Sequence, residues 1–66
     1  MGNFKISDIQ IGDQVYFKLD WKDNYDLYWI VVSKNATQLE IKVNEMGAND
    51  SMWLNVSDVY SLIPKP

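Results

Sequence analysis

Apolar and polar residues alternate along most of this chain, and a period of two indicates half-buried β-strands rather than helices. Residues 37–44 alternate without a break, and residues 14–19 follow the same pattern. Each segment therefore predicts a strand with one face towards a core and the other towards solvent. The residues expected on the core faces are Leu39, Ile41, Val43, Val15, Phe17 and Leu19.

Residues 28–33 are rich in β-branched and aromatic side chains, so they predict another strand. Both of its faces carry bulky groups, and the alternation alone does not choose between them. We favour Ile30 and Val32 as core residues, which leaves Trp29 and Val31 on the other face. A strand near the middle of a curled sheet could also bury part of both faces.

The last part of the chain predicts a strand at residues 51–56, one helical turn at residues 57–59 and a final strand at residues 60–63. Pro64 and Pro66 end the final strand because proline has no N–H for a sheet. Within residues 51–56, the inward residues are Met52, Leu54 and Val56, and the outward residue is Trp53.

Turn-forming residues separate these strands. Gly12 allows a positive φ in a tight turn before the first strand. Asn35 and Ala36 close a short hairpin, residues 44–50 close a longer one, and residues 20–26 form a polar and aromatic loop. The order of elements predicts an all-β fold, a small five-stranded antiparallel barrel with one short helical turn before the last strand.

The composition is that of one folded domain. The chain has 66 residues, of which 47% are hydrophobic and 23% charged, so we expect a single domain over residues 1–66 with its core at residues 9–63. Residues 6–9 and 56–59 are similar in sequence, but four residues are too few to indicate a repeat. The longest apolar run, residues 27–32, is far too short to span a membrane, and the first residues lack a signal-peptide pattern. We therefore expect a cytoplasmic protein without a membrane partner.

Two segments carry a resemblance to a known group of folds. Residues 11–17, Ile-Gly-Asp-Gln-Val-Tyr-Phe, resemble the opening of small SH3-like barrels of the bacterial, KOW and Tudor types. Residues 56–63 resemble the helical turn and last strand that close such barrels. The resemblance covers residues 9–63 and implies an SH3-like β-barrel without implying one function.

The sequence also differs from SH3-like barrels at positions that bear on the class of ligand. The Ala-Leu-Tyr-Asp-Tyr-like segment of peptide-binding members is absent, their tryptophan pair is reduced to Tyr28-Trp29, and no proline precedes Ser57. These differences argue against a proline-rich ligand. The basic loops of KOW-type RNA binders are also missing. The chain does contain aromatic residues of the kind that form the cage of Tudor-type members.

Aromatic residues are the most informative feature, because nine large rings, 14% of the chain, exceed what so small a core can bury. We expect at least two of them to be exposed together as anchors for a binding partner. The candidate contact residues are Trp21, Tyr25, Trp29, Trp53 and Tyr60. The alternative is that the rings cover the open ends of the barrel and hold its long loop in place.

Asp20, Asp23 and Asp26 flank the rings of the long loop and complete the candidate site. An acidic rim around an aromatic pocket would suit a cationic ligand such as a lysine or arginine side chain. A calcium loop is a rival interpretation, but the spacing lacks the required glycine and twelfth-position glutamate. The simplest alternative is a solvated loop in which the aspartates support turns.

The chain has few of the residue types that catalysis and metal binding require. The chain contains no Cys and no His, and all six cationic residues are lysine, so thiolate, imidazole and zinc chemistry are excluded. A formal net charge of −3 argues against a phosphate-binding surface and hence against a nucleic-acid partner. No enzyme activity and no cofactor are expected.

The sequence thus predicts a non-catalytic module that binds a protein or peptide, with a basic partner suited to the acidic loop. One alternative is a small acidic protein of phage or prophage type that acts on a nucleic-acid-binding protein, or a weak nucleic-acid binder that stacks bases on its rings. Another is a structural homo-oligomer joined through Trp53 and Tyr16.

Overall fold

The computed structural model describes residues 4–65, and five strands make up one antiparallel sheet in the order β4-β3-β2-β1-β5. Two 3-10 turns complete the fold, and η2 stands directly before the last strand. The expected all-β class, five-stranded sheet and helical turn are therefore confirmed, whereas η1 was not expected. The elements are η1 (Ile6–Asp8), β1 (Gln14–Phe17), β2 (Trp29–Lys34), β3 (Gln38–Glu45), β4 (Ala48–Asn55), η2 (Val56–Asp58) and β5 (Val59–Ile63).

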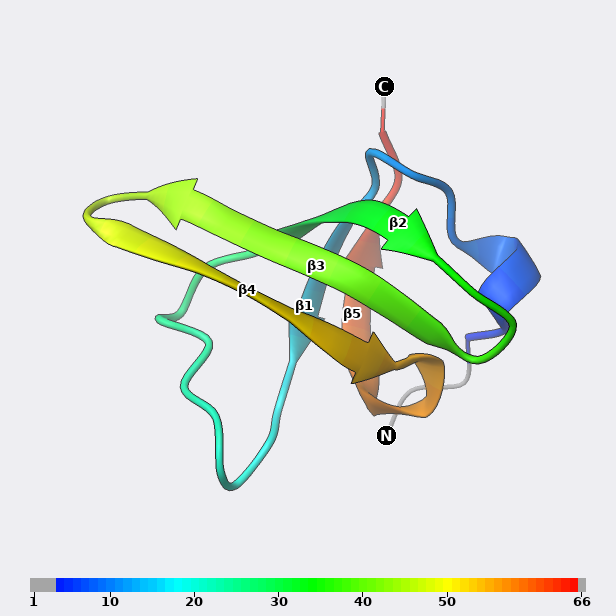
Figure 1. Cartoon of the computed structure of the whole chain (residues 1–66), viewed down its shortest axis with the longest axis horizontal. Helices are drawn as coiled ribbons and strands as arrows, with labels where there is room; N and C mark the ends of the chain where they lie inside the picture. The colour runs from blue at the N-terminus through cyan, green and yellow to red at the C-terminus, as the bar shows by residue number, and fades with distance from the viewer. Residues whose placement is uncertain (1–3, 66) are drawn as a thin grey trace.

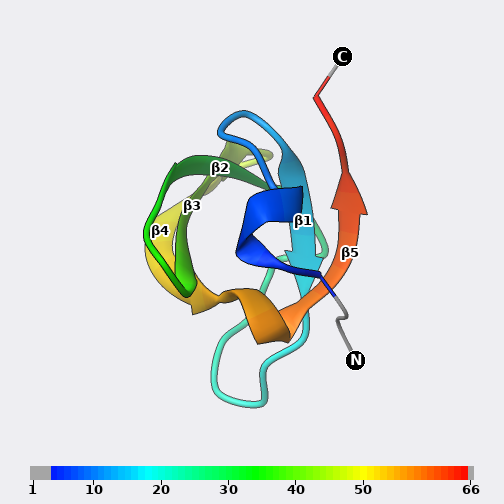
Figure 2. The ribbon, with the colours of Figure 1, turned by 90° about the vertical axis from the view of Figure 1, so that its right-hand side faces the viewer.

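The sheet is strongly curled, so its two halves enclose the core. Figure 1 shows the long β3–β4 hairpin lying across β1 and β5. The view along the curl in Figure 2 shows β2, β3 and β4 on one side and β1 and β5 on the other. Strong curling allows one short chain to surround its apolar residues with a single sheet.

The core consists of ten apolar residues that solvent hardly reaches. Those expected from the alternation in residues 14–19 and 37–44 are confirmed, with Leu19 partly buried at the margin. Leu54 is buried and Met52 partly buried, as expected for the strand that follows. The core residues are Ile9, Val15, Phe17, Trp29, Val31, Leu39, Ile41, Val43, Leu54 and Val59.

The expected orientation of β2 is wrong. Trp29 and Val31 are fully buried, whereas Ile30 and Val32 are 45% and 43% exposed. The cross-strand register explains the outcome, since Val31 lies opposite the buried Ile41. The indole of Trp29 also meets the ring of Phe17 edge-on at 5.2 Å between centroids, so the larger side chain fills the core.

The hairpin between β3 and β4 is tighter than expected. Its turn contains only Met46 and Gly47, with φ values of 53° and 83°. Two consecutive left-handed residues are typical of a type I′ turn, which matches the twist of paired strands. The loop expected at residues 44–50 is therefore mostly strand. This two-residue turn was not predicted from the sequence because methionine rarely adopts a left-handed backbone conformation.

The two ends of the curled sheet are covered differently. Figure 2 shows η1 across one end, where Ile9 is buried and the ammonium of Lys34 donates to the carbonyls of Ile6 and Ile9 at 3.3 and 2.8 Å. The loop of residues 18–28, called the β1–β2 loop below, lies at the opposite end (Figure 1). None of the helical segments within residues 4–65 has the length and apolarity of a bilayer-crossing helix.

Asp13 is a buried carboxylate that joins the two ends of the chain. It is 3% exposed and accepts hydrogen bonds from the backbone N–H groups of Gln10 at 2.8 Å and Lys65 at 2.9 Å. These two bonds hold the pKa of Asp13 below its usual value, and the charges of Lys65 and Lys34 act in the same direction. The neighbouring Gly12 has a φ of +100°, which confirms the expected turn.

Candidate functional site

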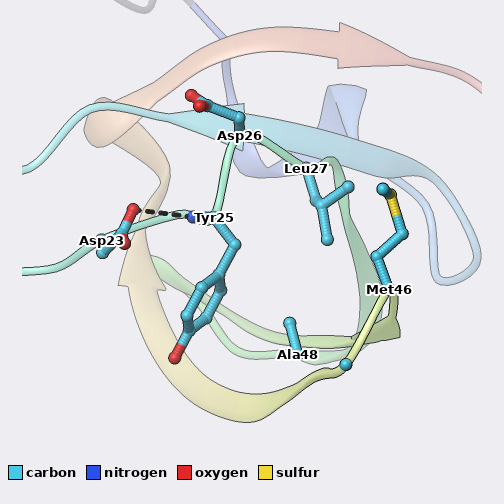
Figure 3. A pocket seen from close by; sticks show the side chains of 7 residues that line it. Asp23, Tyr25, Asp26, Leu27, Met46 and Ala48 are labelled. Atoms are coloured by element: carbon cyan, nitrogen blue, oxygen red, sulfur yellow. Dashed lines mark hydrogen bonds between the residues drawn. The ribbon is translucent and has the colours of Figure 1, made fainter.

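A pocket of about 500 Å³ opens at the end of the molecule where the β1–β2 loop meets the β3–β4 turn. We call it the end pocket. Figure 3 shows the side chains of Tyr25, Leu27, Met46 and Ala48 around one space, with Asp23 at its margin and the carboxylate of Asp26 pointing away from it. The pocket is lined by Asp23, Tyr25, Asp26, Leu27, Met46, Gly47 and Ala48.

Tyr25 forms the aromatic wall of the end pocket, and Trp29 supports it from behind. The two rings are stacked, with 6.2 Å between centroids and 12° between planes. Tyr25 is 42% exposed, as expected for a contact residue, but Trp29 is fully buried. The expected surface position of Trp29 is therefore wrong, because this indole belongs to the core and positions the ring of Tyr25.

Asn24 holds the β1–β2 loop in the conformation that presents Tyr25. Its carbonyl oxygen accepts the indole N–H of Trp29 at 3.1 Å and the backbone N–H of Leu27 at 3.1 Å. Its side-chain oxygen accepts the N–H of Asp26 at 2.9 Å, and its side-chain amide donates to the carbonyl of Phe17. The backbone and side chain of this one residue thus tie the loop to β1 and to the core.

Asp50 on β4 fastens the other side of the loop. Its carboxylate forms an ion pair with Lys22 and accepts the hydroxyl of Tyr25 at 3.4 Å. The hydrogen bond between the two charged groups lowers the pKa of Asp50 and raises the pKa of Lys22. The ammonium of Lys22 also lies 5.9 Å from the centroid of the Trp29 ring. These contacts hold the loop against β4 and the core.

Unusual backbone conformations gather at the end pocket. Within residues 4–65, the three non-glycine residues with positive φ are Tyr25 at 60°, Asp26 at 55° and Met46 at 53°. All three line the pocket. A left-handed conformation costs about 1–2 kcal/mol per ordinary residue, and such strain is often concentrated where a site is shaped for a ligand.

The loop aspartates have different surroundings. Asp23 accepts the backbone N–H of Tyr25 at 2.8 Å, and Asp26 accepts the hydroxyl of Tyr16 at 3.2 Å. All three aspartates line a shallow groove beside Tyr16 and Lys18, but Asp20 does not line the end pocket. Hence two of the three aspartates predicted for the acidic rim lie at the pocket.

The remaining predicted contact rings are exposed but lie elsewhere. Trp21 is 73% exposed in the loop, and Trp53 is 46% exposed on the outer face of β4. Tyr60 on β5 is 49% exposed, with the ring of Tyr16 at 6.4 Å and the ammonium of Lys18 at 4.5 Å from its centroid. The five predicted rings therefore lie in four places, with Tyr25 and the buried Trp29 at the end pocket and the other three each elsewhere.

Four of the seven residues that line the end pocket were not expected from the sequence. Leu27, Met46 and Ala48 provide its apolar lining. Only the hairpin register brings Met46 and Ala48 to the β1–β2 loop, and Leu27 looked like part of an apolar run. One sequence feature could have predicted the tight turn, namely a methionine followed by a glycine between two segments of alternating apolar and polar residues.

Comparisons of the chain with models of protein families, with curated proteins and with solved structures gave no match.

Proposed function

We propose that this chain is a non-catalytic protein-interaction module of the SH3-like type, and that its end pocket binds a lysine or arginine side chain of a protein partner. The observation that carries the proposal is a pocket lined by apolar side chains together with two aspartates, Asp23 and Asp26. Long cationic side chains have an apolar stem and a charged head, so they require both features in one place.

The apolar stem is matched by Tyr25, Leu27 and Met46. The phenol ring of Tyr25 is held parallel to the indole of Trp29 by stacking. Little conformational entropy is therefore lost when the apolar stem of a ligand side chain packs against the ring. Met46 is 88% exposed at the tip of the hairpin, and its flexible thioether can close over a ligand.

The charged head is matched by Asp23 and Asp26. Asp23 and Asp26 both belong to the pocket lining, with the carboxylate of Asp26 turned towards the hydroxyl of Tyr16, and the nearby cation Lys22 is paired with Asp50. A ligand ammonium or guanidinium therefore meets negative charge at the margin and an aromatic ring beside it. Strain at Met46 gives independent support, since an asparagine would suit the turn better and a methionine there is explained by contact with a ligand.

The test is a titration of the isotope-labelled chain with N-acetyl-lysine amide, N-acetyl-arginine amide and N-acetyl-norleucine amide, monitored by NMR. Norleucine matches the stem of lysine without the charge. We expect the lysine and arginine probes to shift the amide signals of Tyr25, Met46 and Ala48, and norleucine to bind more weakly. Equal binding of all three probes, or shifts confined to other surfaces, would refute the proposal.

Two variants separate binding from folding. Asp23→Asn keeps an oxygen for the N–H of Tyr25 and removes the charge, so it should weaken lysine binding about two- to fivefold and leave norleucine binding unchanged. Met46→Asn should weaken binding of every probe while stabilising the chain by about 1 kcal/mol, because asparagine accepts the left-handed conformation. Unaltered binding in both variants would contradict the proposed pocket.

A further inference from the structure

β4 forms one edge of the sheet, and within residues 4–65 no strand pairs with its outer side. The two-residue turn makes Glu45 and Ala48 a hydrogen-bonded pair, and the pattern of an antiparallel ladder then alternates along the hairpin. Even-numbered residues of β4 consequently bond to β3. Odd-numbered residues, including Ser51, Trp53 and Asn55, direct their N–H and C=O groups outward.

Two observed hydrogen bonds agree with this alternation. The N–H of Val56 donates to the carbonyl of Thr37 at 3.1 Å, which continues the even-numbered bonds beyond the end of β4. The N–H of Ser51 instead donates to the Asp50 carboxylate at 2.8 Å, so it takes no part in the ladder with β3.

The edge at β4 has few of the features that prevent edge strands from pairing with other chains, and Asp50 is its one charged residue. It has eight residues in an uninterrupted register with β3, and its sequence contains neither lysine nor proline. The opposite edge differs, because β5 has five residues, its register with β1 shifts between Tyr16 and Phe17, and Pro64 follows it. Of the two edges, β4 is therefore the one available for pairing.

Charge and exposed apolar surface favour a second copy of this chain as the occupant. Residues 51–55 carry no charge, and Asp50, the one charged residue of β4, is paired with Lys22. Two identical strands can thus meet there without like charges facing each other. Trp53 presents a half-exposed indole on the outer face of the same segment.

We propose that β4 pairs antiparallel with β4 of a second copy about a two-fold axis at Trp53, which forms one continuous ten-stranded sheet. Ser51 then lies opposite Asn55 of the second copy, and its carbonyl accepts the N–H of that Asn55 while its own N–H stays with Asp50. The two Trp53 indoles lie side by side on one face. Such an interface is self-complementary by symmetry. Cross-strand aromatic pairs add to the backbone hydrogen bonds.

The first test compares Asn55→Pro with Asn55→Ala. Asn55 has a φ of −64°, which proline adopts without strain, and its N–H points away from β3. Both variants lose the side-chain bond from Gln38 to Asn55, but only proline removes the edge N–H. Light scattering between about 10 µM and about 1 mM should show the mass of the wild type rising from one chain to two. Asn55→Ala should behave like the wild type.

Asn55→Pro should weaken the pairing about tenfold or more, because the symmetry removes two backbone hydrogen bonds. Trp53→Lys should also abolish the rise in mass, whereas Ile63→Lys, at a residue of similar exposure on the other edge, should not. Amide exchange of the wild type should slow with concentration at Trp53 and Asn55. A mass of one chain at every concentration, or a dimer that survives Asn55→Pro and Trp53→Lys, would overturn the proposal.

Discussion

Asp13 shows how a single side chain can hold distant parts of a small domain together. Its buried carboxylate accepts the N–H groups of Gln10 and Lys65, and its own carbonyl accepts the N–H of Val31 at 2.9 Å. The turn before β1, the strand β2 and the segment after β5 therefore meet at one residue. In a chain this short, few other groups are available to fix the ends.

At the residue scale we predict that Asp13→Asn destabilises the fold by about 2 kcal/mol at neutral pH. The two backbone N–H groups donate to different carboxylate oxygens, and asparagine would place an NH2 donor against one of them. The folded state lowers the pKa of Asp13 from 3.8, so its contribution is present above that value. The contribution is lost as the pH falls through the lower pKa of the folded state.

Urea denaturation at a series of pH values checks this prediction. The difference between the wild type and Asp13→Asn should narrow as the solution is made acidic. Asp20→Asn serves as the control, since Asp20 is exposed in the loop and should leave the midpoint unchanged. A difference that stays constant down to strongly acidic pH would show that the carboxylate charge plays no part.

At the element scale, β2 determines which bulky residues form the core. We predict that Val31→Thr lowers the free energy of unfolding by about 1–3 kcal/mol, because it buries a hydroxyl without a partner. Val32→Thr should change it by less than about 0.5 kcal/mol, since Val32 is half exposed on a strand. Thermal denaturation of the two variants gives the comparison. Equal losses would mean that both faces of β2 are buried.

The contrast between β3 and β2 explains how much of the fold could be predicted. In β3 each apolar residue has polar neighbours, so period two assigned the core face correctly. In β2 the apolar residues are consecutive, and only the register with Ile41 decides between the faces. Such pairing depends on strands distant in sequence, which a local pattern does not contain.

The residues of the candidate site also differ in how far the sequence could predict them. Tyr25, Asp23 and Asp26 belong to one polar loop, so composition identified them. Met46 and Ala48 join them only through the hairpin, and the burial of Trp29 follows from its contact with Phe17. Residues from one segment were therefore predictable, and residues assembled by tertiary contacts were not.

At the scale of the whole molecule, the two ends of the curled sheet contribute unequally to stability. Lys34 donates to two carbonyls at the end that η1 covers, whereas the ion pair of Asp50 with Lys22 is partly exposed at the end pocket. We predict that Lys34→Met lowers the free energy of unfolding by about 1–2 kcal/mol. Asp50→Asn should loosen the β1–β2 loop with little change in the thermal midpoint.

Hydrogen exchange distinguishes the two effects. The indole N–H of Trp29 donates to the carbonyl of Asn24, so its exchange rate reports on opening of the loop. Asp50→Asn should speed the exchange of this proton and leave the core amides of β3 unaffected. Lys34→Met should speed both. Equal acceleration of the loop and the core in Asp50→Asn would mean that the molecule opens as one unit.

The three tryptophans lie in three environments, with exposed fractions of 0% at Trp29, 46% at Trp53 and 73% at Trp21. The chain therefore carries its own optical probes. With the other two replaced by phenylalanine, Trp29 alone would emit at short wavelength and report on unfolding. Trp53 alone would report on pairing between copies, and Trp21 alone on motion of the β1–β2 loop. Folding, assembly and loop dynamics can thus be followed separately by fluorescence, without an added label.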